Sequence, residues 1–144
     1  MKVSSKSRYG LAAMVDLAST AKRGPVTLAA IAKRQEISLN YLEQLFGGLK
    51  RAGMVASIKG PNGGYQLKLS AKEISCKDIL EALEGEFTYK DGPKEDSLME
   101  ACLYEEVFHP LSNKIKTCLE EITLDQLVQS YKNKKEKEII MYYI

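Results

Sequence analysis

Apolar residues recur at helical spacing three times near the start of the chain. The first helix is predicted over residues 6–22, where Arg8 and Asp16 are the charges in the middle of an apolar run, so we expect it to be mostly buried. A short second helix is predicted over residues 28–35, and a third begins after Ser38, a natural N-cap. One apolar stripe marks the third helix: Leu42, Leu45, Phe46 and Leu49.

A β-hairpin is predicted directly after these helices. Residues 54–58 are apolar, residues 65–69 alternate between apolar and polar side chains, and residues 59–64 combine Lys, Gly, Pro and Asn as turns do. Two helices joined by a short turn and followed by a hairpin predict a winged helix-turn-helix domain. The fold class is mainly α with a small β-hairpin. The predicted domain spans residues 1–84, ends with a helix capped by Ser75, and has its wing over residues 54–69.

From residue 98 to residue 122 the apolar positions follow a seven-residue repeat, which favours a long helix packed against another long helix. No second long helix is predicted in this sequence, so the expected partner is the same helix of another chain in a homodimer. Pro110 lies inside the run and predicts a kink or a local break. The repeat positions, and hence the predicted dimer interface, are Ala101, Tyr104, Phe108, Leu111, Ile115, Cys118 and Ile122.

The segments on either side of the long helix have weaker patterns. Residues 85–97 collect Gly, Pro, Lys and acidic residues and are predicted to form a loop. Residues 98–144 make up the dimerisation helix, a short helix capped by Thr123 and a C-terminal tail. The last residues, 139–144, are apolar enough that we expect them to dock on the body of the protein.

Charge is distributed unevenly along the chain. Residues 1–70 hold eleven Lys and Arg against three Asp and Glu, a balance of +8, whereas residues 71–144 have a balance of −6. A basic first half attracts a polyanion such as double-stranded DNA. The polar side of the third helix carries groups that suit base edges or phosphates, namely Asn40, Tyr41, Glu43, Gln44 and Lys50. Glu43 is equally compatible with a plain surface charge, and Tyr41 with a place at the edge of the core.

The chemistry-bearing residues do not indicate an enzyme. The sequence has no nucleophile–base pairing, phosphate-binding loop or metal-ligand spacing. Cys76, Cys102 and Cys118 are odd in number and widely spaced, which favours free thiols in a reducing compartment. Cys76, in the first turn of its helix, could be a reactive thiol but is better explained as inert, and a structural role is favoured for His109 over metal binding. Neither a secretory signal nor a run of roughly 20 apolar residues is present, so we expect a cytoplasmic protein without membrane contact.

Three stretches, residues 4–11, 37–45 and 59–65, together resemble the signature regions of the Rrf-two family of bacterial winged-helix transcription regulators. That family includes iron–sulfur cluster regulators, nitric oxide sensors and cysteine-metabolism repressors. The resemblance implies a dimer joined by the long C-terminal helix, with two winged helices on a palindromic operator, usually as a repressor. It assigns DNA contacts on the third helix to Ser38, Asn40, Tyr41, Glu43 and Gln44. Contacts with the DNA backbone or minor groove fall to Arg8, Lys59, Gly63 and Gly64.

This sequence departs from the cluster-binding members of that family. Those members carry three cysteines between the fourth helix and the long helix, where only Cys102 matches, and Glu105 stands at the place of their histidine. One thiolate cannot hold an iron–sulfur cluster, so no cofactor is expected. The end of the chain, residues 141–144, is similar to the cluster-free cysteine-metabolism repressors, which makes cysteine synthase a candidate partner. Two alternative functions are a redox or iron–sulfur sensor that uses Cys102, and a protein-binding adaptor. Cys102 is also compatible with a packing role, as a small hydrophobic residue near the dimer interface.

Overall fold

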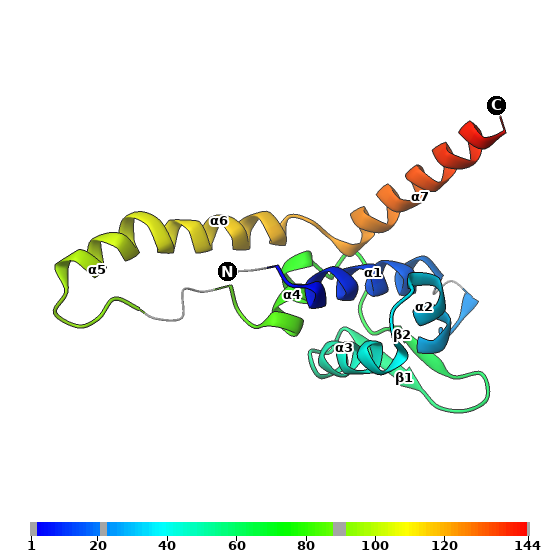
Figure 1. Ribbon diagram of the computed structural model, residues 1–144. Helices are drawn as coiled ribbons and strands as arrows, with labels where there is room; N and C mark the ends of the chain where they lie inside the picture. Colours follow the sequence, from blue (N-terminus) through cyan, green and yellow to red (C-terminus); the bar gives the residue numbers. More distant parts are fainter. Residues whose placement is uncertain (1–2, 21–22, 88–91, 144) are drawn as a thin grey trace.

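The computed structural model describes residues 3–20, 23–87 and 92–143. Residues 21–22 of the predicted first helix, residues 88–91 of the predicted loop, and Ile144 lie outside this range. Figure 1 shows a small helical body, a two-stranded hairpin at one edge of it, and two C-terminal helical segments that extend beyond it. The elements of the body are α1 (Ser5–Thr20), α2 (Leu28–Gln35), α3 (Leu39–Arg51), β1 (Val55–Ile58), β2 (Gly64–Leu67) and α4 (Cys76–Glu84).

Local capping explains where the helices of the body begin. The Thr27 hydroxyl accepts a hydrogen bond from the Ala30 amide at 3.2 Å, and the Ser38 hydroxyl accepts one from the Tyr41 amide at 3.2 Å. Each bond satisfies an amide that has no partner within its helix. Glu36, with φ of 53°, ends α2 in the left-handed conformation and turns the chain into α3. The predicted helix-turn-helix, with α2 over 28–35, is confirmed.

The core of the body draws apolar side chains from every helix in it. Met14, Leu17, Ile31, Phe46 and Ile79 are fully buried. Leu124 and Val128, from the start of the last helix, belong to the same cluster. The predicted apolar stripe of α3 is confirmed, because all four of its residues are buried in this core: Leu42, Leu45, Phe46 and Leu49.

The buried charge of α1 is paired. The Asp16 carboxylate accepts bonds from Arg34 Nε at 3.0 Å and Arg34 Nη2 at 2.7 Å, and from Gln35 Nε2 at 2.8 Å. These bonds join α1 to the last turn of α2, and they raise the pKa of Arg34, chiefly through the hydrogen bond to Asp16. A charge as buried as Asp16 needs such partners, because burial without them costs several kcal/mol.

The hairpin pairs its strands antiparallel, with Val55 opposite Leu67 and Ile58 opposite Gly64. It is tied to the body by a bridge in which Val26 and Tyr65 exchange backbone hydrogen bonds of 2.8 and 2.7 Å. The Tyr65 ring packs edge-on against Phe46 of α3, with ring centroids 5.0 Å apart. These contacts hold the wing beside α3 and confirm the predicted winged helix-turn-helix fold.

The long C-terminal run is helical but changes its hydrogen-bonding pattern. It comprises α5 (Leu98–Leu103), a π-helical turn η2 (Tyr104–Phe108) and α6 (His109–Glu120). The His109 amide donates to the Tyr104 carbonyl, five residues back. Pro110 has no amide hydrogen to donate, and the π turn sits directly before it. The kink or local break expected at Pro110 takes the form of this π turn, which ends at Phe108 while the run stays helical.

The last helix corrects two expectations. We expected a short helix after Thr123, but α7 (Leu124–Tyr142) has 19 residues, because Lys, Glu and Gln favour a helix and no Gly or Pro interrupts it. It is therefore a second long helix, so the premise that the chain has only one is wrong. The expected docking of residues 139–143 on the body is also wrong: α7 carries them away from it, and Tyr142 is 87% exposed. No helix among the described residues could span a membrane, since none is both long and apolar enough.

Candidate nucleic-acid interface

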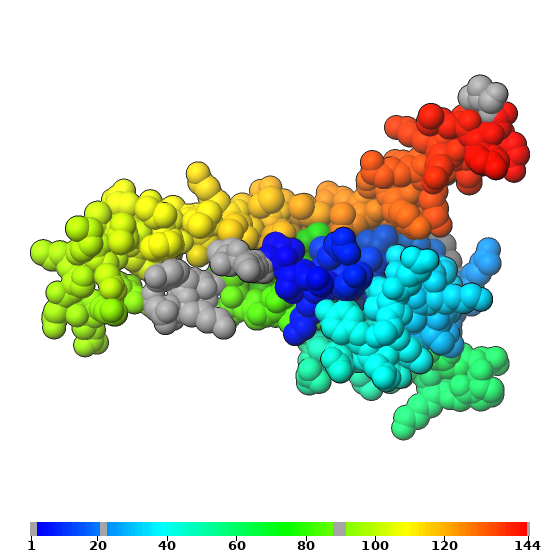
Figure 2. Space-filling model, in the orientation of Figure 1, coloured from blue at the N-terminus to red at the C-terminus, as the bar shows by residue number. Residues whose placement is uncertain are grey.

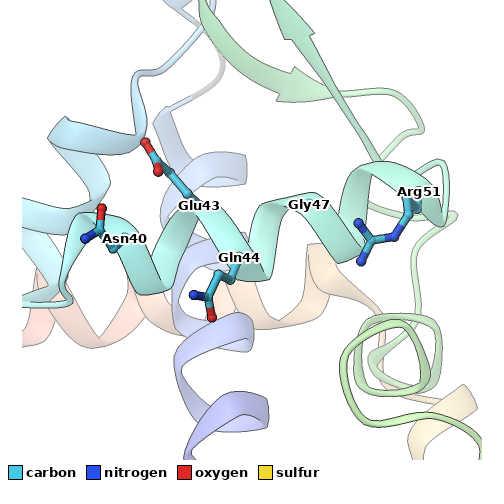
Figure 3. A pocket seen from close by; sticks show the side chains of 5 residues that line it. All are labelled: Asn40, Glu43, Gln44, Gly47 and Arg51. Carbon is cyan, nitrogen blue, oxygen red and sulfur yellow. The ribbon is translucent and has the colours of Figure 1, made fainter.

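The exposed side of α3 carries a row of polar residues. Asn40, Glu43 and Gln44 are exposed and, with Gly47 and Arg51, line a shallow hollow that we call the α3 hollow. Figure 3 shows the side chains of Asn40, Glu43, Gln44 and Arg51 spread along α3, with Glu43 and Gln44 pointing to opposite edges of the helix in this view. They are spaced three or four residues apart, whereas the buried stripe occupies the opposite side. This row offers amide, carboxylate and guanidinium groups to a ligand and takes no part in the core.

Tyr41 and Arg8 connect α3 to the start of α1. Tyr41 is half-buried, and its ring meets Tyr9 edge-on at a centroid distance of 5.9 Å. The Arg8 guanidinium lies over the Tyr9 ring at 5.1 Å, a cation–π contact. Tyr41 thus does cover the edge of the core, as one interpretation allowed, and it supports a stack that places Arg8 near α3. The exposed Arg8 cation suits a phosphate at the edge of the interface.

A second groove lies between α3, the start of α2 and the wing. Its lining includes Thr27, Leu39, Glu43, Gly60 and Gly63. Glu43 therefore borders both this groove and the α3 hollow. A side chain that borders both can respond to a ligand in either.

The lysines of α3 and the wing differ in their surroundings. Lys50 turns toward the wing, where its ammonium donates a hydrogen bond of 2.8 Å to the Ser57 hydroxyl. Lys59 is exposed at the start of the hairpin turn. Lys50 therefore braces the wing against α3, and Lys59 is the better placed of the two to meet a phosphate.

Gly63 and Gly64 have a structural reason to be glycine. A Cβ atom at Gly63 would overlap the Ile58 carbonyl, and one at Gly64 would overlap the backbone of Val26. Gly64 also has φ of 153°, which disfavours other residues. These glycines permit the tight wing and its bridge to the body. Their contact with DNA stays a prediction.

Arg51 and Gly47 were not among the predicted DNA-binding residues. Both line the α3 hollow with Asn40 and Gln44. Extending the helical spacing from residues 40 and 44 to residues 47 and 51 would have found them. Arg51 also lines a smaller pocket with Lys6 and Gln44, which places cations from α1 and α3 around one site.

The cysteines are scattered and their donor set does not fit an iron–sulfur cluster. Cys76 is buried, and burial raises the pKa of its thiol, contrary to the reactive alternative. Cys102 and Cys118 are exposed on the C-terminal run. Within the described residues no three His, Cys, Asp or Glu side chains gather as a metal site would require. His109 contacts Asn113 at 3.1 Å instead.

The predicted dimer positions differ in exposure along the C-terminal run. Ala101, Tyr104 and Phe108 are half-buried within the chain, and Leu111 is 47% exposed. Leu103 and Val107, which the seven-residue repeat did not include, are exposed to a similar degree. A π turn holds extra residues per turn, so it shifts the face on which earlier residues lie. Exposed apolar residues therefore recur at spacings of four: Leu103, Val107 and Leu111. Of the remaining predicted positions, Ile115 and Ile122 are half-buried and Cys118 is exposed.

The exposed polar side of α3 offers groups that suit DNA, and comparison with known proteins identifies the family of the chain. The Rrf2 family model, described as an iron-dependent transcriptional regulator, matches residues 3–130. The chain belongs to the Rrf2 family. This confirms the resemblance seen in the sequence. The Rrf2-family protein is a DNA-binding transcriptional regulator and not an enzyme.

Individual relatives are similar to this chain over most of its length. The HTH-type transcriptional regulator IscR of Pectobacterium carotovorum subsp. carotovorum is 42% identical over 132 residues, covering 90% of this chain and 80% of that protein. The structure of CymR, the global cysteine regulator of B. subtilis, matches with a TM-score of 0.78 at 34% identity and covers 90% of this chain and 98% of that one. The structure of T. potens IscR matches with a TM-score of 0.73 at 37% identity, covering 91% of this chain and 88% of that one.

Proposed function

We propose that this Rrf2-family regulator acts in the cytoplasm as a homodimeric repressor on a palindromic operator, in cysteine, sulfur or iron–sulfur metabolism. Each protomer places α3 in the major groove and its wing on the adjacent backbone. The observation that carries the proposal is the polar row of the α3 hollow, which is exposed and contributes nothing to the core. A role in cysteine metabolism is suggested by CymR, a global cysteine regulator, and a link to iron by the family description as an iron-dependent regulator.

The residues divide into two roles. Asn40, Glu43 and Gln44 carry donors and acceptors that match base edges and so determine sequence preference. A second set supplies positive charge to the phosphates and determines general affinity: Arg8, Lys59 and Arg51. Ser38 shapes the start of α3, since its hydroxyl already accepts the Tyr41 amide. Lys50 holds the wing in place through Ser57.

Titration of duplex DNA at physiological salt separates these roles. The probes are a duplex selected by the wild-type protein from a randomised pool and a scrambled duplex of the same composition. Gln44→Ala relaxes the preference for the selected duplex by roughly 1–3 kcal/mol, the size of one good base contact. Lys59→Ala weakens both duplexes alike and lowers the salt slope by about one. A wild-type protein that selects no sequence contradicts the proposal and favours the adaptor alternative.

The dimer in this proposal forms through the C-terminal run. Leu103, Val107 and Leu111 leave an apolar stripe exposed, which the same run of a second copy would cover. Two winged helices related by two-fold symmetry suit a palindromic operator, whose half-sites repeat at about one helical turn of DNA.

Iron sensing is the second candidate, because the matching family model is described as iron-dependent. Cys102 is exposed, and it lies in the region where the cluster-binding members of the family carry their cysteines. An absorbance spectrum and an iron assay on protein purified without oxygen test this directly. Colourless, iron-free protein that still binds the selected duplex supports the cofactor-free proposal. Brown protein with stoichiometric iron supports the sensor and overturns the cofactor-free proposal.

A protein partner such as cysteine synthase stays a prediction from the sequence. The surface on which to test it is the exposed end of α7, where apolar residues stand clear of the body: Ile139, Ile140, Met141, Tyr142 and Tyr143.

A further inference from the structure

Most glycines in the described part of the chain have a conformational or steric reason. Five adopt positive φ, where other residues are strained: Gly24, Gly53, Gly60, Gly64 and Gly85. A Cβ atom at Gly10 would overlap Leu83, and one at Gly63 would overlap the Ile58 carbonyl. Gly48 faces α4, and its Cβ would lie 3.4 Å from the Ala82 carbonyl oxygen. The fold itself accounts for all of these glycines except Gly48, where 3.4 Å is an ordinary contact and a methyl group fits against α4.

Gly47 has no such reason. It lies in the interior of α3, where glycine is the poorest helix former after proline. The nearest atom to a Cβ built there, neighbouring residues of the helix backbone aside, is Arg51 Nη1 at 3.6 Å. That is an ordinary contact with the end of a flexible side chain. Alanine would therefore fit the free protein and strengthen the helix.

The position of Gly47 points to a ligand. It lines the α3 hollow between Gln44, which is suited to base edges, and Arg51, which is suited to phosphate. Figure 3 shows the bare helix at Gly47 between these two side chains. Without a Cβ at Gly47, the backbone of α3 allows close approach at the centre of the proposed interface, where its nearest neighbour is the end of the flexible Arg51 side chain.

We propose that Gly47 is a specificity-determining position at which a DNA base edge packs directly on the α3 backbone. The amide of a residue in mid-helix donates to the carbonyl four residues back, so it is not available to a phosphate. What Gly47 offers is an apolar Cα surface, which suits the methyl or carbon edge of a base in the major groove. Close seating at Gly47 also brings Asn40, Glu43 and Gln44 within reach of their base edges. The inference rests on the proposed function, in which α3 enters the major groove.

The test combines two measurements on Gly47→Ala, with Gly48→Ala as the matched control in the same helix but on the face toward α4. Thermal unfolding reports the free protein, and Gly47→Ala raises the midpoint by about 3 °C because alanine is the better helix former. Titration of the selected and scrambled duplexes reports the complex. Gly47→Ala weakens binding to the selected duplex roughly tenfold or more, the size of a lost base contact, and leaves the scrambled duplex within about twofold. Gly48→Ala retains the preference.

Each other result overturns the inference or the function beneath it. Wild-type preference in Gly47→Ala, together with lost preference in Gln44→Ala, overturns close approach at Gly47 and leaves the proposed function standing. Equal loss of sequence preference in Gly47→Ala and Gly48→Ala also overturns close approach at Gly47. Preference would then depend on the flexibility of α3 and not on the room for a base at Gly47. A lowered unfolding midpoint for Gly47→Ala shows that the fold itself requires the glycine. If neither Gln44→Ala nor Gly47→Ala alters preference, the placement of α3 in the major groove fails.

Discussion

The body of the molecule, α1 to α4 with the hairpin, and the C-terminal half, residues 98–143, expose opposite kinds of surface. In the body most of the large apolar residues are buried, and the exposed side of α3 carries polar side chains. In the C-terminal half the reverse holds: Leu98 is 90% exposed and Met99 70% exposed. Figure 2 shows this half extending beyond the body at both ends. The body draws Leu124 and Val128 of α7 into its core and presents a polar surface on α3 to a ligand. The exposed apolar residues of the C-terminal half instead call for another protein surface.

The two halves also differ in whether their charged side chains are buried and paired or lie at the surface. In the body, the buried Asp16 is neutralised by Arg34, and Glu84 accepts hydrogen bonds from Ser4 and Ser7. Where the C-terminal half meets the body, Lys77 of α4 and Glu120 of α6 make a surface ion pair. Surface pairs of this kind contribute little to stability. The body is therefore where charge changes should alter folding, and the C-terminal half is where they should alter association.

The largest expected effect is in the body, from Arg34→Ala. This change leaves the Asp16 carboxylate, whose side chain is 3% exposed, without its cation. Unfolding free energy falls by about 3 kcal/mol, because a buried charge without a partner is strongly unfavourable. Chemical denaturation measures it, with Lys33→Ala, an exposed neighbour on α2, as the control. Equal effects of the two variants would mean that the pair does not support the fold.

The next effect tests the C-terminal half. Val107→Glu places a charge on the exposed stripe of η2 and weakens the homodimer by about 2 kcal/mol, roughly thirtyfold in its dissociation constant. Leu69→Glu, on the body and 44% exposed, serves as the control and leaves the dimer intact. Sedimentation measures both. A monomeric wild-type protein, or a dimer that tolerates Val107→Glu, removes the stripe from the interface.

A smaller effect is expected at the contact between α1 and α4. Hydrogen bonds, first from Ser4 and then from Ser7, lower the pKa of Glu84. A carboxylate with a lowered pKa in the folded state stabilises the protein at neutral pH, and this stabilisation is lost as the pH falls through that pKa. Glu84→Gln therefore costs about 0.5 kcal/mol at neutral pH, allowing for solvent screening, and nothing in strong acid. Chemical denaturation across pH measures the unfolding free energy of the wild type and of Glu84→Gln, with Glu86→Gln, at an exposed position, as the control. A difference between the wild type and Glu84→Gln that persisted in acid would refute this prediction.

The smallest effect is expected at the end of α7. Tyr142→Ser changes unfolding free energy by less than about 0.5 kcal/mol, because Tyr142 is exposed and supports no part of the core. Thermal unfolding of Tyr142→Ser beside Tyr65→Ser, whose ring packs on Phe46, measures the contrast. A large loss in Tyr142→Ser would show that another surface covers α7 in solution, and would weaken the comparison between the halves.

Local rules account for much of the fold and for part of the candidate site. The Ser38 cap, the apolar stripe of α3 and the wing turn depend on residues within a few positions of each other, and all were predicted. The same spacing placed Asn40, Glu43 and Gln44 on the exposed side of α3. These features needed no knowledge of what α3 packs against, because helical periodicity and capping act over one or two turns.

Only the tertiary structure decided the rest. Asp16 and Arg34 lie 18 residues apart, and Ser4 and Glu84 lie 80 apart, so their pairing depends on how helices meet. The exposed end of α7 depends on the direction in which that helix leaves the core after Val128, which no local pattern encodes. Gly47 and Gly63 are the same residue type in the sequence. A Cβ at Gly47 would contact only the end of the flexible Arg51 side chain, whereas one at Gly63 would overlap the backbone of the wing. Only packing in three dimensions sets that difference.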